Sequence, residues 1–300
     1  MSTFRRPTPR PTYAEPTVIR RQDTAHHVWG DAGAGLVTDR VYSSSLNLHV
    51  LEFELPAGAG FTHSETNKTV FAGDVAYCVL DGELVLANPL VGEVRRVRAG
   101  QGVLFRRDTW HHGFNPTGGT TRVLEFFSPP PSRGTASEYA RQQPMIPEVS
   151  YADRRWLGRW PAARDESERA VSLHVLDDDR ALWGFAATAP THLTATWVST
   201  EFLTVVHGTV FPGNIEDFRP CVDETSIVCT AGELWVDMRL ADDTFAPACL
   251  SPGDGVVLPA GTPWRALVRA SHPAEYLLGE GRVPEGWVPG PPPAPATMGG

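Results

Sequence analysis

A histidine and a carboxylate at short spacing in the first half of the chain have the chemistry of a divalent metal site. His63 and Glu65 are two residues apart, so in an extended strand both side chains point to the same face of the sheet. Two imidazoles and one carboxylate on one side of an ion leave about three coordination positions open, as in non-haem Fe(II) sites. Which second histidine joins His63 and Glu65 depends on the fold.

The segments that would position these residues are predicted to be short strands. Runs of β-branched and aromatic residues, such as 46–55, 75–80 and 122–127, are separated by Gly, Pro, Asp and Asn. Evenly spaced short strands with turn residues between them are typical of an all-β sandwich or barrel. One helix is expected between the two halves, because Thr135 and Glu138 form a capping box and Pro144 ends the run.

The two halves of the chain repeat one pattern of turns. The stretch 80–111 is matched by 230–264, and equivalent positions hold Gly82 and Gly232, Gly100 and Gly253, and His111 and Trp264. A repeat of half the chain length indicates two copies of one structural unit. The loss of His111 from the second copy indicates that the two copies have different roles.

These residues resemble the cupin superfamily. The second cupin motif spaces a glycine, a proline, a glycine, a histidine and an asparagine as Gly100, Arg106, Asp108, His111 and Asn115 are spaced here, with Arg106 and Asp108 as departures. The resemblance implies an all-β protein with two double-stranded β-helix (jelly-roll) barrels in tandem, a bicupin. The expected boundaries are a flexible N-terminal arm at 1–21, a barrel with the metal site at 22–132, a connector with a short helix at 133–164, a degenerate barrel at 165–285 and a flexible Pro-rich tail at 286–300.

The resemblance also implies a ligand set at the mouth of the first barrel. In the first cupin motif, Glu65 takes the place of a second histidine after His63, and Asp74 lies next to the usual glutamate position. The fold would bring His111 from the facing strands. We therefore expect one divalent metal bound by His63, Glu65 and His111, with Asp74 as a fourth ligand or a partner of a ligand histidine. Fe(II) is favoured, and Mn, Zn, Ni and Cu are alternatives. His112 is expected to point away from His111, as a surface residue or as a partner of a ligand.

Two further residues are candidates for contact with a substrate. Tyr77 is expected to point inward, with core packing as the alternative. Arg106 precedes His111 and could bind a substrate carboxylate, or could lie in a solvated turn. Arg122 follows the distal histidine at a spacing that also resembles the arginine of 2-oxoglutarate-dependent oxygenases.

The leading functional hypothesis is a metal-dependent enzyme that acts on a small organic molecule. Its metal would activate O₂ as Fe(II), or would act as a Lewis acid in an isomerase or lyase. The alternative is a non-catalytic bicupin that binds or senses a small ligand, and a storage protein is a weaker one. In the second barrel, Trp264 is expected to be buried in a scaffold that lacks polar groups. A binding site for an effector there is the alternative.

Composition limits the partners. The net charge of −9 is spread along the 300 residues, so no basic surface for nucleic acid is expected. No apolar run is long enough to span a membrane, and no secretory signal opens the chain. The four cysteines lack metal-binding spacing and are expected to be buried thiols in a cytoplasmic protein. A homodimer is an arrangement that the sequence leaves open.

Overall fold

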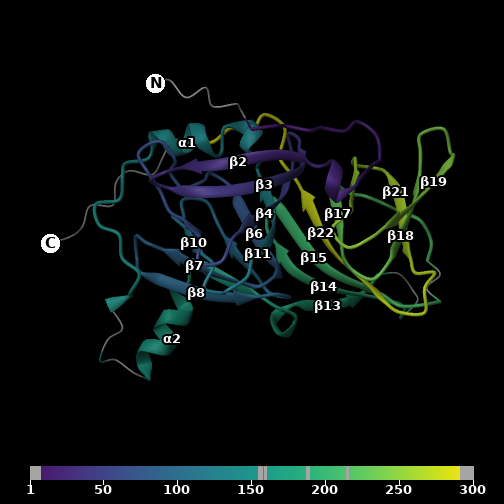
Figure 1. The fold of residues 1–300 in the computed structure, drawn as a ribbon. Coiled ribbons are helices and arrows are strands. Elements are labelled where there is room, and N and C mark those ends of the chain that lie inside the picture. Colours follow the sequence, from purple (N-terminus) through teal and green to yellow (C-terminus); the bar gives the residue numbers. More distant parts are fainter. Residues whose placement is uncertain (1–7, 155–157, 159–160, 187–189, 214–215, 291–300) are drawn as a thin grey trace.

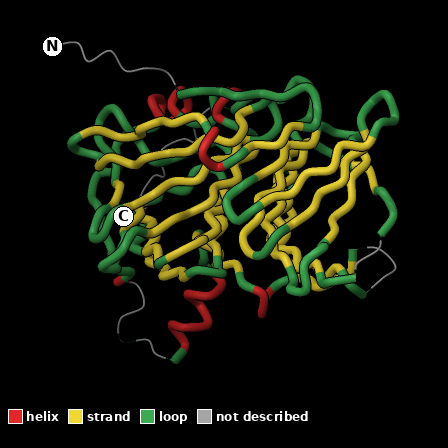
Figure 2. Tube along the Cα trace, turned by 45° about the vertical axis from the view of Figure 1, so that its right-hand side comes forward, coloured by secondary structure: helices red, strands yellow, loops and turns green. Residues whose placement is uncertain are grey.

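The chain folds into two β-barrels that lie side by side (Figure 1). The computed structural model describes residues 8–154, 158, 161–186, 190–213 and 216–290. Throughout these residues the paired strands are antiparallel, and strands dominate both barrels (Figure 2). The predictions of an all-β fold and of two tandem jelly-roll barrels are confirmed.

The first barrel consists of two sheets. Its seven-stranded sheet has the order β12 (Leu173–Leu176), β9 (Gly102–Phe105), β6 (Asp74–Asp81), β11 (Thr121–Ser128), β4 (His49–Leu55), β3 (Gly35–Ser44) and β2 (Ala25–Asp31). Its four-stranded sheet has the order β5 (Gly60–Phe61), β10 (His112–Phe114), β7 (Glu83–Asn88) and β8 (Glu93–Arg98). Because successive side chains on a strand point to opposite faces, alternate residues of each strand fill the interior.

The second barrel repeats this plan. Its seven-stranded sheet has the order β1 (Thr17–Ile19), β20 (Gly255–Leu258), β17 (Glu224–Ala231), β22 (Ala274–Gly281), β15 (Leu203–Val210), β14 (His192–Ser199) and β13 (Leu182–Phe185). Its four-stranded sheet has the order β16 (Arg219–Pro220), β21 (Pro263–Leu267), β18 (Leu234–Arg239) and β19 (Phe245–Leu250). Gly82 and Gly232 have φ values of 75° and 72°, as equivalent tight turns of the repeat require.

The two barrels exchange one strand each. Strand β1, near the N-terminus, pairs with β20 of the second barrel, and β12 pairs with β9 of the first barrel. Residues 17–19, in the expected N-terminal arm, therefore form a strand of the second barrel, and residues 173–176, in the expected second barrel, form a strand of the first. Each exchanged strand covers a sheet edge that would otherwise leave backbone groups unpaired.

The interface between the barrels is an apolar layer between the two large sheets. Outward residues of the first barrel, such as Val50, Ala76 and Phe126, pack in one buried cluster with Val205 and Leu277 of the second. Figure 1 shows these sheets in the middle of the molecule, with β11, β22 and β15 adjacent. Burial of apolar side chains of this kind is the main source of stability at such contacts.

Helices lie outside the barrels. Helix α1 (Ser137–Gln142) confirms the helix predicted near Thr135. The predicted capping box is wrong: Thr135 donates its hydroxyl to the carbonyl of Pro129, and the cap residue Ala136 makes no side-chain cap. Helix α2 (Ala162–Arg169), at the end of the connector, was not predicted. In the described parts of the chain, no helix has the length and apolar character of a membrane span.

The C-terminal segment is partly attached to the barrels. Trp287 packs edge-on against Phe202, with the ring centroids 5.7 Å apart. The carbonyl of Gly290 accepts a hydrogen bond from Arg107. Residues 287 and 290 of the expected tail thus contact the barrels, while residues 1–7 and 291–300 lie outside the described part.

Candidate functional site

The first barrel encloses a cavity of about 720 Å³. Aromatic side chains form much of its wall, namely Trp29, Phe53, Phe61, Phe71 and Phe127. Helix α1 contributes Ala136, Ser137, Ala140 and Arg141 at one side of the opening. A cavity of this size with a few polar groups on an apolar wall is typical of a small-molecule site.

Three ionisable residues point into this cavity from the large sheet. Glu125 lies on β11 between the inward residues Val123 and Phe127, and Asp39 lies on β3 between Val37 and Val41. His49 begins β4 and shares the inward side with Leu51 and Phe53. All three side chains line the cavity. Strand alternation therefore places charged residue types where apolar ones would be expected.

The pKa of the Glu125 carboxyl group is raised strongly in this cavity. Burial raises its pKa to about 8, and the negative charge of Asp39 adds to the effect. The side chain of Glu125 makes no hydrogen bond or ion pair with any residue in the described ranges. At neutral pH the side chain is therefore a protonated acid whose donor and acceptor face the cavity.

The two neighbouring residues have different partners. Asp39 accepts a hydrogen bond from Nδ1 of His27 at 2.9 Å, yet burial raises its pKa. Burial lowers the pKa of His49 to about 3, so its imidazole is neutral. Nδ1 of His49 is buried and has no hydrogen-bond partner. A buried polar atom without a partner is costly, which favours a ligand at this position.

His111 and Tyr77 also line the cavity, as the sequence predicted for inward residues. Phe71 and Phe105 flank the His111 ring, with centroids at 4.9 and 4.2 Å. Burial lowers the pKa of His111 to about 3 and raises that of Tyr77 well above 10. Nε2 of His111 lies 3.4 Å from the Tyr77 hydroxyl, so the closest polar neighbour of this nitrogen is a phenol.

His63 does not join His111. Its Nδ1 lies 2.7 Å from Nε2 of His112, and Nδ1 of His112 lies 2.8 Å from the hydroxyl of Tyr151. His112 is buried and is the direct partner of His63, so it is not a surface residue. Burial lowers the pKa of both imidazoles, that of His112 to about 4.

The two expected carboxylate ligands lie in different surroundings. Glu65 is exposed at the rim of the cavity. Asp74 is buried and binds Nε of Arg106 at 3.0 Å. Arg106 also binds Glu201 of the second barrel at 2.5 Å, so Arg106 joins the two barrels and does not line the cavity. The expected substrate contact of Arg106 is thus replaced by an interface role.

The four expected ligands therefore do not form one metal site. Among the residues that the structure describes, no group of three or more His, Cys, Asp or Glu side chains has a metal-binding arrangement. The reason is geometric: Asp74 starts β6 at the barrel interface, and His63 turns to the neighbouring His112. These donors, as they are placed, do not fit a divalent ion.

Arg122 does not lie in the cavity, where the resemblance to 2-oxoglutarate-dependent oxygenases would place it. Its guanidinium makes two hydrogen bonds to the carboxylate of Glu52, at 2.9 and 3.0 Å. Glu52 also binds Arg21 from the N-terminal segment. Since Arg122 does not line the cavity, it cannot hold a cosubstrate there in this arrangement.

Cationic residues surround the opening of the cavity. Arg10, Lys68 and Arg141 line it from the N-terminal segment, the loop before β6 and helix α1. Their positive charge favours an anionic ligand. Sequence reasoning missed these residues, and it missed Glu125, Asp39 and His49. A usable signal was present, since each acid lies between two apolar residues at alternate positions.

Trp264 of the second barrel is buried, at 4% exposure, which confirms the expectation for this position. The surroundings are less apolar than expected. His192 is fully buried and lies within hydrogen-bond distance of Glu216 and of the Tyr276 hydroxyl, at 2.8 and 2.7 Å. The expectation that no polar group converges in this barrel is therefore wrong.

The sequence matches no known family model and no curated protein. Solved structures resemble the fold along most of the chain. Protein Ylba from E. coli aligns with a TM-score of 0.60 and 9% identity, over 90% of this chain and 92% of that chain. Oxalate decarboxylase from Lactobacillus farciminis aligns with a TM-score of 0.57 and 10% identity, over 90% and 87%. Vicilin from hazelnut, Corylus avellana, gives 0.56 and 13%, over 88% and 85%. At these identities the likeness establishes the fold and not an activity.

Proposed function

We propose that this chain, which has the two-barrel cupin fold, uses the cavity of its first barrel to bind a small organic anion and to transfer protons on it, as an isomerase or lyase does. The observation that carries the proposal is the buried, unpartnered Glu125, whose pKa of about 8 keeps it protonated at neutral pH. An acid with a pKa near the working pH is well suited to general acid catalysis.

The other groups of the cavity supply complementary functions. His49 is neutral, and its Nδ1 has no partner, so it can accept a hydrogen bond from a ligand. Tyr77 and neutral His111 can orient a carbonyl or hydroxyl oxygen by hydrogen bonds. The aromatic wall excludes water and strengthens these polar interactions.

The cationic rim indicates the class of substrate. Arg10, Lys68 and Arg141 can attract a carboxylate to the opening, while the rest of the molecule enters between the aromatic rings. An organic acid that carries an acidic C–H group next to a carbonyl group has both the carboxylate for the opening and a carbon that can exchange its proton inside. Ionised Glu125 can take the proton from that carbon, and the acid that this forms can return it, so the exchange needs no further reactant.

Deuterium exchange tests the proposal without knowledge of the natural substrate. The protein is incubated in D₂O with a panel of short 2-oxo and 3-oxo acids, and deuterium uptake at carbon is followed by NMR. We expect uptake with at least one acid, reduced by about 10²–10⁴-fold in Glu125→Gln, which preserves size but cannot transfer the proton. Glu233→Gln on the second barrel is the control. Uptake that persists fully in Glu125→Gln contradicts the proposal, and binding without uptake supports a non-catalytic binding protein.

The metal-dependent alternative, an Fe(II) oxygenase or a Lewis-acid enzyme, requires a rearrangement. His63 would have to leave His112 and turn towards His111, and a carboxylate would have to join them. Elemental analysis of protein purified without chelators separates the two proposals. One ion per chain that is lost in both His63→Ala and His111→Ala would favour the metal-dependent enzyme.

A further inference from the structure

The second barrel has a cavity of its own, of about 280 Å³. It lies inside the barrel, and β14, β15, β17, β21 and β22 contribute residues to its lining. This volume suits a ligand of only a few heavy atoms. The cavity does not share lining residues with the cavity of the first barrel.

One wall carries a positive charge on an aromatic ring. The guanidinium of Arg219 lies over the indole of Trp264, with its carbon 4.5 Å from the ring centroid. Such a contact holds an arginine by cation–π attraction and leaves N–H donors for other acceptors. The Tyr276 hydroxyl and the charge of Glu216 also interact with this guanidinium. A guanidinium in this position can bind a carboxylate through two parallel hydrogen bonds.

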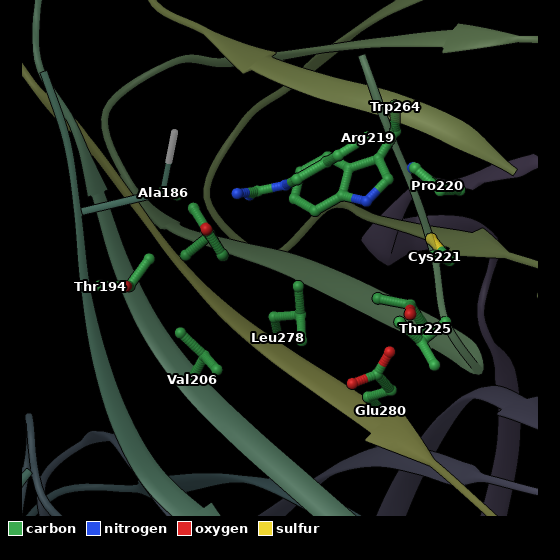
Figure 3. Close-up of a pocket in the computed structure, with 12 residues that line it drawn as sticks. Ala186, Thr194, Val206, Arg219, Pro220, Cys221, Thr225, Trp264, Leu278 and Glu280 are labelled. Atoms are coloured by element: carbon green, nitrogen blue, oxygen red, sulfur yellow. The ribbon is translucent and has the colours of Figure 1, made fainter. Parts of the chain in front are cut away.

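The opposite side of the cavity carries a negative charge. Figure 3 shows Glu280 across the pocket from Arg219 and Trp264, with Leu278 between them. Arg219 and Glu280 form no ion pair with each other in the described structure. One oxygen of Glu280 accepts a hydrogen bond from the backbone of Asp223, which fixes the direction of its carboxylate.

Cys221 is buried and lines the same cavity as Arg219 and Glu280. Burial raises the pKa of its thiol to about 11, and the charges of Glu280 and Arg219 act on it in opposite directions. Between the charged ends, the side chains of Val206 and Leu278 form an apolar floor (Figure 3). The cavity therefore presents a cation, an apolar surface and an anion in sequence.

We propose that the second barrel is a binding site for a small zwitterion, a free amino acid with an apolar side chain. Its carboxylate binds Arg219, its ammonium group binds Glu280, and its side chain lies on Val206 and Leu278. This site is separate from the chemistry proposed for the first barrel. A molecule with only one of the two charges leaves the other charged residue without its partner, so both charges are required for binding.

Isothermal titration calorimetry of the full chain tests the proposal with three probes of one carbon skeleton. The probes are L-leucine, 4-methylpentanoate, which lacks the ammonium group, and 3-methylbutylamine, which lacks the carboxylate. L-Valine and L-alanine extend the series to smaller side chains. We expect at least one amino acid to bind, and its two singly charged analogues to bind at least about tenfold more weakly.

Variants assign the binding to these residues. Arg219→Met should abolish binding, Arg219→Lys should retain part of it, and Glu280→Gln should reduce the preference for the amino acid over the analogue without an amine. Arg269→Met is the matched control, because Arg269 lies 3.8 Å over the ring of Trp235 but does not line the cavity. Circular dichroism checks that each variant is folded.

Two results would overturn the proposal. One is that no amino acid of the series binds at millimolar concentration to the folded wild-type protein. The other is that an amino acid binds equally well to wild type, Arg219→Lys and Arg219→Met, which would place its carboxylate elsewhere. Neither result bears on the proton transfer proposed for the first barrel, because deuterium uptake is measured separately.

Discussion

Single residues in the first barrel account for most of its capacity for acid–base chemistry. Glu125, His49 and His111 all have pKa values shifted towards their neutral forms, and burial is the main cause in each case. A buried charge is unfavourable unless it is paired, so an unpaired carboxyl keeps its proton and an unpaired imidazole loses it. The same shifts that prepare these groups for acid–base chemistry make the stability of the protein depend on pH.

Glu125 should reduce stability at alkaline pH. Its folded pKa of about 8 lies above the ordinary value of 4.5, so the folded state binds the proton more tightly. The resulting stabilisation is complete below pH 4.5 and is lost as the pH rises through 8. Glu125→Gln cannot ionise and should keep its stability. Urea unfolding at about pH 5 and about pH 8.5 should show the wild type losing several kcal/mol relative to the variant. Parallel curves for the two proteins would contradict the assignment.

His49 should reduce the stability of the folded state at acidic pH. Its folded pKa of about 3 lies below the ordinary value of 6.5, so the unfolded state binds the proton more tightly. Stability should therefore fall as the pH drops from 6.5 towards 3. His49→Phe should flatten this part of the profile, measured by thermal unfolding. His272→Phe, at an exposed position, should leave the slope unchanged.

At the scale of secondary-structure elements, the exchanged strands β1 and β12 connect the two halves of the chain. Strand β1 pairs with β20 from Thr17 to Ile19, and the neighbouring Arg20 binds Asp254 at 2.7 Å. Strand β12 completes the large sheet of the first barrel next to β9. Each barrel thus depends on a segment that lies outside its own half of the repeat.

Removal of residues 1–20 should weaken the second barrel selectively. The truncation deletes β1 and exposes the edge of β20, whose backbone groups lose their partners. We expect faster hydrogen exchange of the amides of 255–258, while the amides of β4 and β11 stay protected. Removal of residues 1–7 alone is the control. If the amides of β20 exchange at the wild-type rate after the longer truncation, β1 is not needed for this edge.

At the scale of the whole molecule, the two barrels form one cooperative unit in our interpretation. They share the exchanged strands, an apolar interface and the ion pair of Arg106 with Glu201. These contacts would be lost together if either barrel unfolded.

Calorimetry should therefore show a single unfolding transition for the full chain. Cooperative coupling predicts that the calorimetric and van't Hoff enthalpies agree. A variant with Phe126→Ala should lower the temperature of this one transition, because Phe126 is fully buried in the shared layer. Two resolved transitions would indicate that each barrel unfolds independently.

The sequence alone determined the class of fold and the plan of two repeated barrels. Strand alternation, glycine turns such as Gly82 and Gly232, and the spacing of the repeat are local properties, and they are legible without knowledge of distant contacts. Alternation also contained the signal for Glu125, a charged residue between two inward apolar positions.

Only the tertiary structure decided which groups meet. The loop before β6 sets the direction of His63, and this loop carries no periodicity that predicts whether His63 reaches His111 or His112. The pairing of β1 with β20 joins residues more than half the chain apart, so no local pattern could reveal it. Long-range contacts depend on the packing of all elements together, whereas periodicity reports only the immediate neighbours of each residue.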